Sequence, residues 1–266
     1  MTDAYRSLLD DLAAEHLALD AVVAALAPEQ WGLTTPSPGW AVRDQVGHLY
    51  YFDGTASLSA TDPAAFVAER DALIQSLADP AQLDAHTLGF ARGASPDELL
   101  AAWRTGRGDL LAALAPLGAK DRLEWYGPPM SAMSFATARL METWAHGQDV
   151  VDAVGADRPA SDRLRHIAHL GVRTRGFAYV LRGREVPAGE IRVELTAPSG
   201  ETWEWGPPEA AAAVTGPALD FCLVVTQRRH PTDTALTITG PLAEDWMAIA
   251  QAFAGAPTTG PAPRPS

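Results

Sequence analysis

The sequence predicts an α+β protein, with an N-terminal antiparallel four-helix bundle followed by a smaller C-terminal α+β domain. Two observations support this fold class. Long segments of the first half repeat apolar residues at three- and four-residue steps, as amphipathic helices do. The second half contains short runs of alternating apolar and polar residues, which are typical of strands. With 47% hydrophobic and 20% charged residues over 266 positions, the chain has the composition of an ordinary globular protein.

The helical pattern of the first half is divided by turns that contain proline and glycine. The clearest helix start is at Ser95, where an N-cap serine is followed by a proline at the first helical position and by two acids. Pro28 ends the first helical segment, and the turn at 35–40 precedes the second. Four long helices with intervening loops indicate a bundle. The predicted helical segments are 3–26, 41–59, 63–78, 95–114 and 131–153.

The second half combines helical and strand patterns. One helix is expected at 160–181, and two alternating runs around a Pro-Ser-Gly turn at 190–206 indicate a β-hairpin. A third strand at 234–240 is bracketed by helical segments at 217–227 and 241–254, which together indicate a small α+β unit. The proline-rich end is predicted to be disordered. The expected domains are the bundle at 1–156, the α+β domain at 157–254 and the disordered tail at 255–266.

Charge and cysteine content narrow the classes of partner. The formal net charge of −13 disfavours nucleic acid and anionic membrane surfaces, and leaves small molecules as expected partners. Cys222 is the single cysteine, which excludes an intramolecular disulfide framework and any site that needs two thiolates. One free thiol, no apolar run of eighteen residues and no basic-then-apolar start favour a cytoplasmic protein. The oligomeric state stays open.

One short stretch, 141–153, carries the candidate chemistry. It places Glu142 and His146 four positions apart and Asp149 three residues later, so a helix would present all three on one face. Two ligands at this spacing can hold one metal ion, and Glu and His suit zinc or another divalent ion. His48, on the second predicted helix, is the candidate third ligand because bundle helices face a shared core. A simple ion pair between Glu142 and His146 fits the same spacing, so the residues alone leave both interpretations open.

Two blocks of sequence resemble a known family. The segment "TPSPGWAVRDQVGHLYYFD", followed about ninety residues later by "ETWAHGQDVVDA", is similar to the mycothiol-dependent maleylpyruvate isomerases of the DinB-like superfamily. The family pattern is Pro-Gly-Trp-x-Val-x-Asp-x-x-x-His-Leu, then Glu-x-x-x-His-x-x-Asp. The resemblance covers the helical half well and the C-terminal unit more loosely, and it implies a DinB-like bundle.

The resemblance also implies a ligand set and a chemistry. In the family's terms, His48, Glu142 and His146 hold a divalent metal, normally zinc. Three protein ligands leave a fourth position open, as in catalytic zinc sites. In the family that position accepts the sulfur of mycothiol. The activated thiol then adds to an electrophilic small molecule, which gives isomerisation or S-transfer. Asp149 would orient a ligating imidazole or bind substrate; the alternative is a surface acid near a helix end.

The C-terminal unit contributes one further candidate. The segment "VVTQRRHP" resembles the place where the family carries an arginine needed for activity, and Arg228 is the match, with Arg229 one step away. A guanidinium there would bind a carboxylate of the substrate or of the thiol cofactor in a bidentate fork. The residues before it depart from the family pattern, so a solvated basic helix end is the alternative.

A second departure touches the scaffold. Relatives often carry Thr or Ser where this chain has Ala41, and loss of such an N-cap hydroxyl costs about 1 kcal/mol. Asp44, three residues later, is expected to compensate in part.

Two other functions remain in competition with thiol activation. The same metal site could activate water as the nucleophile, since metal-bound water ionises near neutrality. Alternatively, the chain could be a non-catalytic module that binds a small ligand or a metal. Dependence on an added thiol separates the first interpretation from the second. The complete ligand trio argues against the third.

Overall fold

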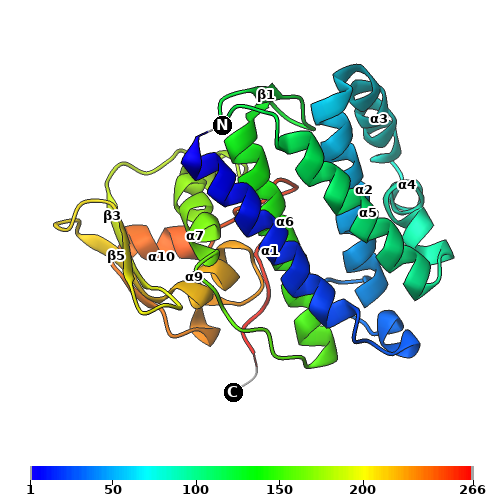
Figure 1. Cartoon of the computed structure of the whole chain (residues 1–266). Coiled ribbons are helices and arrows are strands. Elements are labelled where there is room, and N and C mark those ends of the chain that lie inside the picture. Colours follow the sequence, from blue (N-terminus) through cyan, green and yellow to red (C-terminus); the bar gives the residue numbers. More distant parts are fainter. Residues whose placement is uncertain (1, 265–266) are drawn as a thin grey trace. The chain divides into compact units, whose positions relative to one another are not determined.

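The computed structural model describes residues 2–264. The chain divides into two compact units, Met1–Arg158 and Pro159–Ser266, which are described separately (Figure 1).

The N-terminal unit is built around four long helices. They form two pairs, α1 with α6 and α2 with α5, and α2 also packs against α6. α1 and α6 run in one direction, whereas α2 and α5 run in the opposite direction (Figure 1). The predicted antiparallel four-helix bundle is therefore confirmed. The bounds are α1 Asp3–Val23, α2 Val42–Thr61, α5 Pro96–Leu114 and α6 Ala132–Val154.

Two shorter helices, α3 (Pro63–Ser76) and α4 (Pro80–Gly93), pack against α2. The sequence predicts α3 but not α4. Both begin in the same way: Asp62 and Asp79 cap the backbone through their carboxylates, and each is followed by proline at the first helical position. The unit is completed by a 3-10 helix, η1 (Pro28–Gly32), and by a small antiparallel pair, β1 (Arg122–Leu123) and β2 (Met130–Ser131).

The C-terminal unit contains a four-stranded sheet in the order β4-β3-β5-β6. The predicted hairpin is present as β3 and β4, which pair in antiparallel fashion. β5 was not predicted, and it pairs parallel to β3 and antiparallel to β6. The strand bounds are β3 Ile191–Thr196, β4 Thr202–Trp205, β5 Ala212–Pro217 and β6 Thr237–Thr239.

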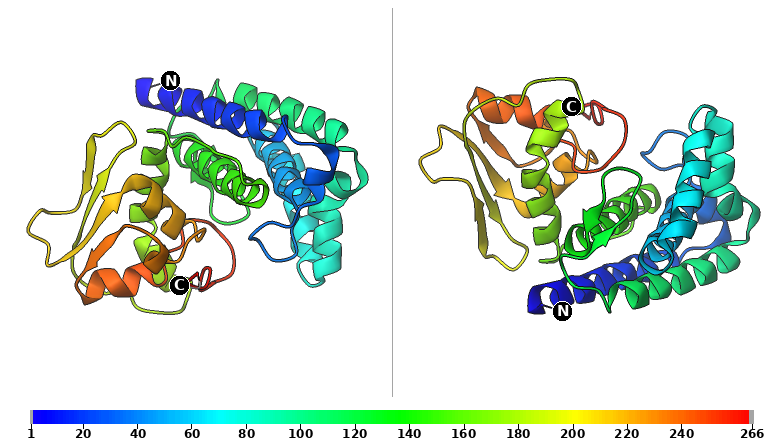
Figure 2. Two further views of the ribbon diagram at one scale, coloured as in Figure 1. Left: turned by 90° about the horizontal axis from the view of Figure 1, so that it is seen from below. Right: turned by 90° about the horizontal axis from the view of Figure 1, so that it is seen from above.

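Helices of this unit gather on one face of its sheet (Figure 2). Along β3 the side chains alternate between buried and outward-facing positions, with Ile191, Val193 and Leu195 in the core. The single helix predicted at 160–181 is divided at Thr174, whose hydroxyl donates to the carbonyls of Leu170 and Gly171. The helix bounds are α7 Leu164–Arg173, α8 Arg175–Val180, α9 Ala218–Val225 and α10 Pro241–Met247, with η2 at Pro231–Asp233.

The end of the described chain, after α10, has no helix or strand. Its Thr258 carbonyl accepts hydrogen bonds from Arg182 and Gln227. Disorder of the tail at 255–266 stays a prediction, and the last two of those residues lie outside the described range. Among residues 2–264, no helix is both long and apolar enough to cross a membrane.

Candidate metal centre

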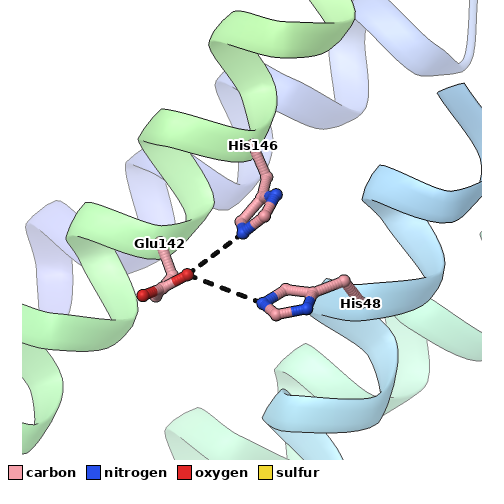
Figure 3. Close-up of side chains that lie close together, drawn as sticks. All are labelled: His48, Glu142 and His146. Carbon is pink, nitrogen blue, oxygen red and sulfur yellow. Dashed lines mark hydrogen bonds and ion pairs between the residues drawn. The ribbon is translucent and has the colours of Figure 1, made fainter. Parts of the chain in front are cut away.

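The packing of α2 against α6 brings the three predicted ligands together (Figure 3). The Nε2 atom of His146 lies 3.1 Å from the Glu142 Oε2 atom, and the Nε2 atom of His48 lies 3.5 Å from the same oxygen. The candidate ligand atoms of the three residues all lie within 4.8 Å of one another. Among the residues that the structure describes, no other group of three or more His, Cys, Asp or Glu side chains lies close enough together to share a metal ion.

Local capping sets the start of the helix that carries His48. The Asp44 carboxylate accepts a hydrogen bond from the Ala41 backbone N–H at 2.9 Å, and Arg92 binds its other oxygen at 2.8 Å. Asp44 thus compensates for the missing hydroxyl at Ala41, by a direct hydrogen bond as well as by its charge. From there, buried Val46 and Leu49 fix the rotation of α2.

The protonation states of the site favour metal binding. Burial, reinforced by the neighbouring His146, lowers the pKa of His48 to about 4, so this imidazole is neutral at pH 7. Burial alone would raise the pKa of Glu142. Close contact with His146 and His48 outweighs burial and holds that pKa well below its usual range. The site therefore presents a neutral imidazole beside a carboxylate, the states in which both groups bind metals.

The other nitrogen of His146 is held by Gln45. Its Nδ1 atom lies 2.5 Å from the Gln45 amide oxygen, which can only accept, so Nδ1 carries the proton. In the neutral ring, the Nε2 lone pair then points at the Glu142 carboxylate. A cation bound between these two acceptors would satisfy both, whereas without one the ring would have to carry a second proton on Nε2 to pair with Glu142. The donor set of His48, Glu142 and His146 therefore fits a divalent metal with three protein ligands.

Aromatic rings surround the two imidazoles. Trp40 stacks on His146 at 5.9 Å between ring centroids and 22° between planes, and it lies 5.4 Å from His48. Phe52 lies 4.5 Å from His48 on another side. The Glu142 side chain keeps 21% of its surface exposed and that of His48 keeps 19%, so a small molecule can reach the cluster from solvent.

Comparisons with known proteins identify the family. A family model described as the mycothiol maleylpyruvate isomerase N-terminal domain matches residues 12–151, a span that contains all three candidate ligands. The chain belongs to this family. The predicted resemblance is confirmed. Within the C-terminal unit, residues 187–239 match a second family model, described as wyosine base formation.

Relatives of this maleylpyruvate isomerase-like chain occur in mycobacteria. Uncharacterised proteins from two strains of Mycobacterium tuberculosis, CDC 1551 and H37Rv, are each 48% identical to it over 250 residues. The alignment covers 94% of this chain and 96% of each relative.

Two solved structures share the fold of this family member. The crystal structure of a mycothiol-dependent maleylpyruvate isomerase superposes with a TM-score of 0.55 at 13% identity. A histidine-to-alanine mutant of that enzyme gives 0.57 at 14%. Each comparison covers 88% of this chain and 92% of the other.

Asp149, the third fixed residue of the family's motif block on α6, is buried. It is 2% exposed, so the interpretation as a surface acid is wrong. The Ser37 hydroxyl donates to its carboxylate at 3.0 Å, which ties the turn at 35–40 to α6. Asp149 therefore helps to place Trp40, which belongs to the same turn. A direct role of Asp149 toward a ligand or substrate stays a prediction.

Arg228 and Arg229 belong to the C-terminal unit, while the three ligands belong to the N-terminal unit of this family member. They follow α9 directly, after Gln227 in a left-handed conformation with a φ of 59°. Arg228 donates to the Thr226 carbonyl at 2.7 Å, and Arg229 donates to the Arg228 carbonyl at 2.7 Å. Their predicted roles in binding a carboxylate stay predictions.

No sequence pattern pointed to the residues that support the candidate ligands. Gln45 lies one turn before His48 on α2, and this spacing is the signal that could have found it. A second missed contact is a buried ion pair between the same two helices. Arg139 on α6 donates to the Asp53 Oδ1 atom through Nε at 3.0 Å and Nη2 at 2.8 Å. The Trp103 indole donates to the other carboxylate oxygen at 3.2 Å.

Proposed function

We propose that this protein is a metal-dependent enzyme that activates a low-molecular-weight thiol, mycothiol, for addition to an electrophilic small molecule. The observation that carries the proposal is the cluster of His48, Glu142 and His146, whose candidate ligand atoms lie within 4.8 Å of one another, with the side chains of His48 and Glu142 partly exposed. Membership of the mycothiol maleylpyruvate isomerase N-terminal domain family supports the choice of thiol. Isomerisation is the outcome that the family favours, with S-transfer as the other product of the same addition.

Zinc is the metal that the donor set favours. Two imidazole nitrogens and one carboxylate oxygen form one of the ligand sets of catalytic zinc sites, where the fourth position is left for water or substrate. A divalent ion held by these residues would supply the positive charge that keeps a bound sulfur deprotonated at neutral pH. Glu142 contributes the only formal negative charge among the three ligands, so the loaded site would keep a net positive charge.

The surroundings suit an electrophile with a flat, unsaturated part. Trp40 and Phe52 present aromatic faces beside the imidazoles. Such faces pack well against a conjugated double bond and exclude water from it. A carboxylate on the substrate or on the thiol would be bound by Arg228, with Arg229 beside it, as the family resemblance implies.

The chain's own thiol is unsuited to the task. Cys222 is fully buried in α9, and burial raises the pKa of its thiol. The Sγ–H group donates to the Leu164 carbonyl at 3.5 Å. A buried, protonated thiol is a poor nucleophile. The nucleophilic sulfur therefore comes from a cofactor.

The proposal is tested by cobalt substitution followed by titration with mycothiol. We expect one metal ion per chain and a sulfur-to-cobalt charge-transfer band that grows with added thiol. His146→Ala should abolish stoichiometric metal binding. His86→Ala is the matched control, because His86 also contacts a carboxylate, Glu69 at 2.9 Å, but outside the cluster.

Two outcomes would contradict the proposal. Bound cobalt without a sulfur band would exclude thiol activation and favour activated water. A folded His146→Ala variant that keeps its full metal content would show that the three residues are not the ligands.

A further inference from the structure

We infer that Gln45, held in turn by Thr35, is a positioning residue that fixes the proton of His146 on Nδ1 and so keeps Nε2 free to bind a metal. This inference rests on the metal site of the proposed function. It assigns a role to two residues outside the ligand trio.

A short chain of hydrogen bonds decides which end of the Gln45 amide faces His146. The Gln45 Nε2 group donates to the Thr35 hydroxyl at 2.8 Å, and that hydroxyl donates to the Trp40 carbonyl at 3.0 Å. The carbonyl is an acceptor only, so it fixes the direction of the hydroxyl proton. The hydroxyl must then accept from the amide NH₂ group, which leaves the amide oxygen toward His146.

The reversed amide would satisfy fewer groups. With its NH₂ group toward His146, the amide oxygen would take the Thr35 proton, and the bond from that hydroxyl to the Trp40 carbonyl would be lost. The observed orientation makes three hydrogen bonds in sequence, and the reversed one makes two. Gln45 is fully buried, so water does not replace a lost partner.

The orientation has a direct consequence for the ligand. With its proton on Nδ1, neutral His146 turns an Nε2 lone pair toward the Glu142 oxygen 3.1 Å away. For the neutral ring, a hydrogen bond to Glu142 would need that proton on Nε2, and only a doubly protonated ring could donate to Gln45 and Glu142 together. Gln45 therefore opposes a hydrogen bond from neutral His146 to Glu142 and favours metal binding at Nε2. Second partners of ligating histidines commonly act in this way.

Thr35 also helps to hold His146 indirectly, through Trp40. Its backbone N–H donates to the Trp40 carbonyl at 2.9 Å, in addition to the bond from its hydroxyl. The two bonds close the turn at 35–40, in which Gly39 has a φ of +79°. The closed turn places the Trp40 ring on the face of His146. The imidazole is thus held at its edge by Gln45 and on its face by Trp40.

The test compares Gln45→Leu with Gln45→Glu in zinc-loaded, ¹⁵N-labelled protein without any thiol. In the wild type, the Nδ1–H of His146 should exchange slowly with solvent. Gln45→Leu removes the acceptor, so we expect fast exchange and a zinc dissociation constant raised by roughly 10–100-fold. Gln45→Glu keeps an acceptor and should keep both slow exchange and tight binding, whereas a merely space-filling role would predict wild-type behaviour for Gln45→Leu as well.

A second pair of variants keeps the test decisive if Gln45→Leu does not fold. Thr35→Val removes the hydroxyl that orients the amide, and should speed exchange of the same N–H and weaken zinc binding severalfold. Thr143→Val is the matched control, because this buried threonine on α6 donates only to the Arg139 carbonyl of its own helix. It should leave both readouts unchanged.

The outcomes separate this inference from the proposed function. If the wild type binds zinc and folded Gln45→Leu and Thr35→Val both keep slow exchange and wild-type affinity, the positioning role is wrong and the metal site stands. If the wild type binds no zinc, the positioning role and the proposed metal site fail together. If Gln45→Leu speeds N–H exchange and weakens zinc binding as expected, but the cobalt-substituted protein shows no sulfur band, the positioning role stands and thiol activation is overturned.

Discussion

Removal of one partner from the buried Asp53–Arg139 pair should destabilise the bundle strongly. Asp53 is completely buried and Arg139 is 3% exposed. Arg139→Met would take away both hydrogen bonds to the Oδ1 atom, and would leave the carboxylate with the Trp103 indole at 3.2 Å. A buried charge without its counter-ion costs about 3–5 kcal/mol. We therefore expect the free energy of unfolding to fall by that amount.

The assay is urea unfolding of the metal-free protein, followed by far-ultraviolet circular dichroism and analysed at constant m value. Arg184→Met is the control. Arg184 also binds a carboxylate, Asp245, through two contacts at 2.8 Å, but these side chains are 43% and 38% exposed. Exposed pairs contribute little, so this variant should unfold close to the wild type. A loss below about 1 kcal/mol in Arg139→Met would refute the reasoning, because it would mean that the carboxylate finds solvent or another partner.

Three further predictions concern packing, pH and reactivity. Gly47→Ala should destabilise the protein by about 1–3 kcal/mol, because an added Cβ would lie 2.4 Å from the Ala91 Cβ atom. Gly54→Ala on the same helix is the control: its Cβ would meet nothing within 4 Å, so this variant should gain about 0.5–1 kcal/mol of stability. The urea midpoints of the two variants test both expectations. Burial lowers the pKa of His16 from 6.5 to about 4, so the unfolded chain binds more protons between these values. The contribution of neutral, buried His16 to the free energy of unfolding is complete above pH 6.5. Roughly 3 kcal/mol of that free energy should be lost as the pH falls to 4. His16→Phe should remove that part of the pH dependence in urea titrations, and an unchanged slope would contradict the burial effect. Cys222 should not react with a thiol reagent in the native protein and should react fully in denaturant; fast native reaction would show that α9 opens.

The sequence predicts the helices of the bundle because each has an unbroken apolar face and a strong start or stop. α5 is the clearest case, with its capping box between Ser95 and Glu98. α4 escaped prediction because only Leu88 and Ala91 on it are buried, so its periodicity is weak. β5 escaped because the run of alanines at 210–213, which leads into it, favours a helix, and it is the parallel pairing with β3 that makes it a strand.

In the candidate site too, some contacts follow from the local sequence and others depend on tertiary packing. Glu142 and His146 lie one helical turn apart, so their meeting follows from the sequence. The position of His48 beside them was predicted from the packing of bundle helices and from the family's motif. Gln45 lies 101 positions from His146, and Asp53 lies 86 from Arg139. Such contacts depend on the register between α2 and α6, and periodicity fixes which face of a helix is buried but not how far one helix slides along another.

Polar contacts between α2 and α6 supply that register. Along α2 the positions are Gln45, His48 and Asp53, and along α6 they are His146, Glu142 and Arg139 in reverse order, as antiparallel packing requires. A slip of one turn would move either helix by about 5.4 Å and break every one of these contacts. Apolar side chains tolerate such slips far better, because their attraction has no direction. The buried ion pair therefore serves the metal site by fixing alignment more than by adding stability.

The double variant Asp53→Leu with Arg139→Met should separate stability from alignment. An apolar replacement of both partners should restore stability to within about 1–3 kcal/mol of the wild type, the remaining loss being the unpaired Trp103 indole. The zinc affinity of the double variant should nevertheless stay below that of the wild type, because the alignment of His48 with Glu142 then loses the ion pair and depends on the Gln45–His146 contact. Zinc titration of the refolded variant, beside its urea midpoint, checks both parts. Wild-type affinity in a fully stable double variant would mean that apolar packing alone sets the register of the two ligand-bearing helices.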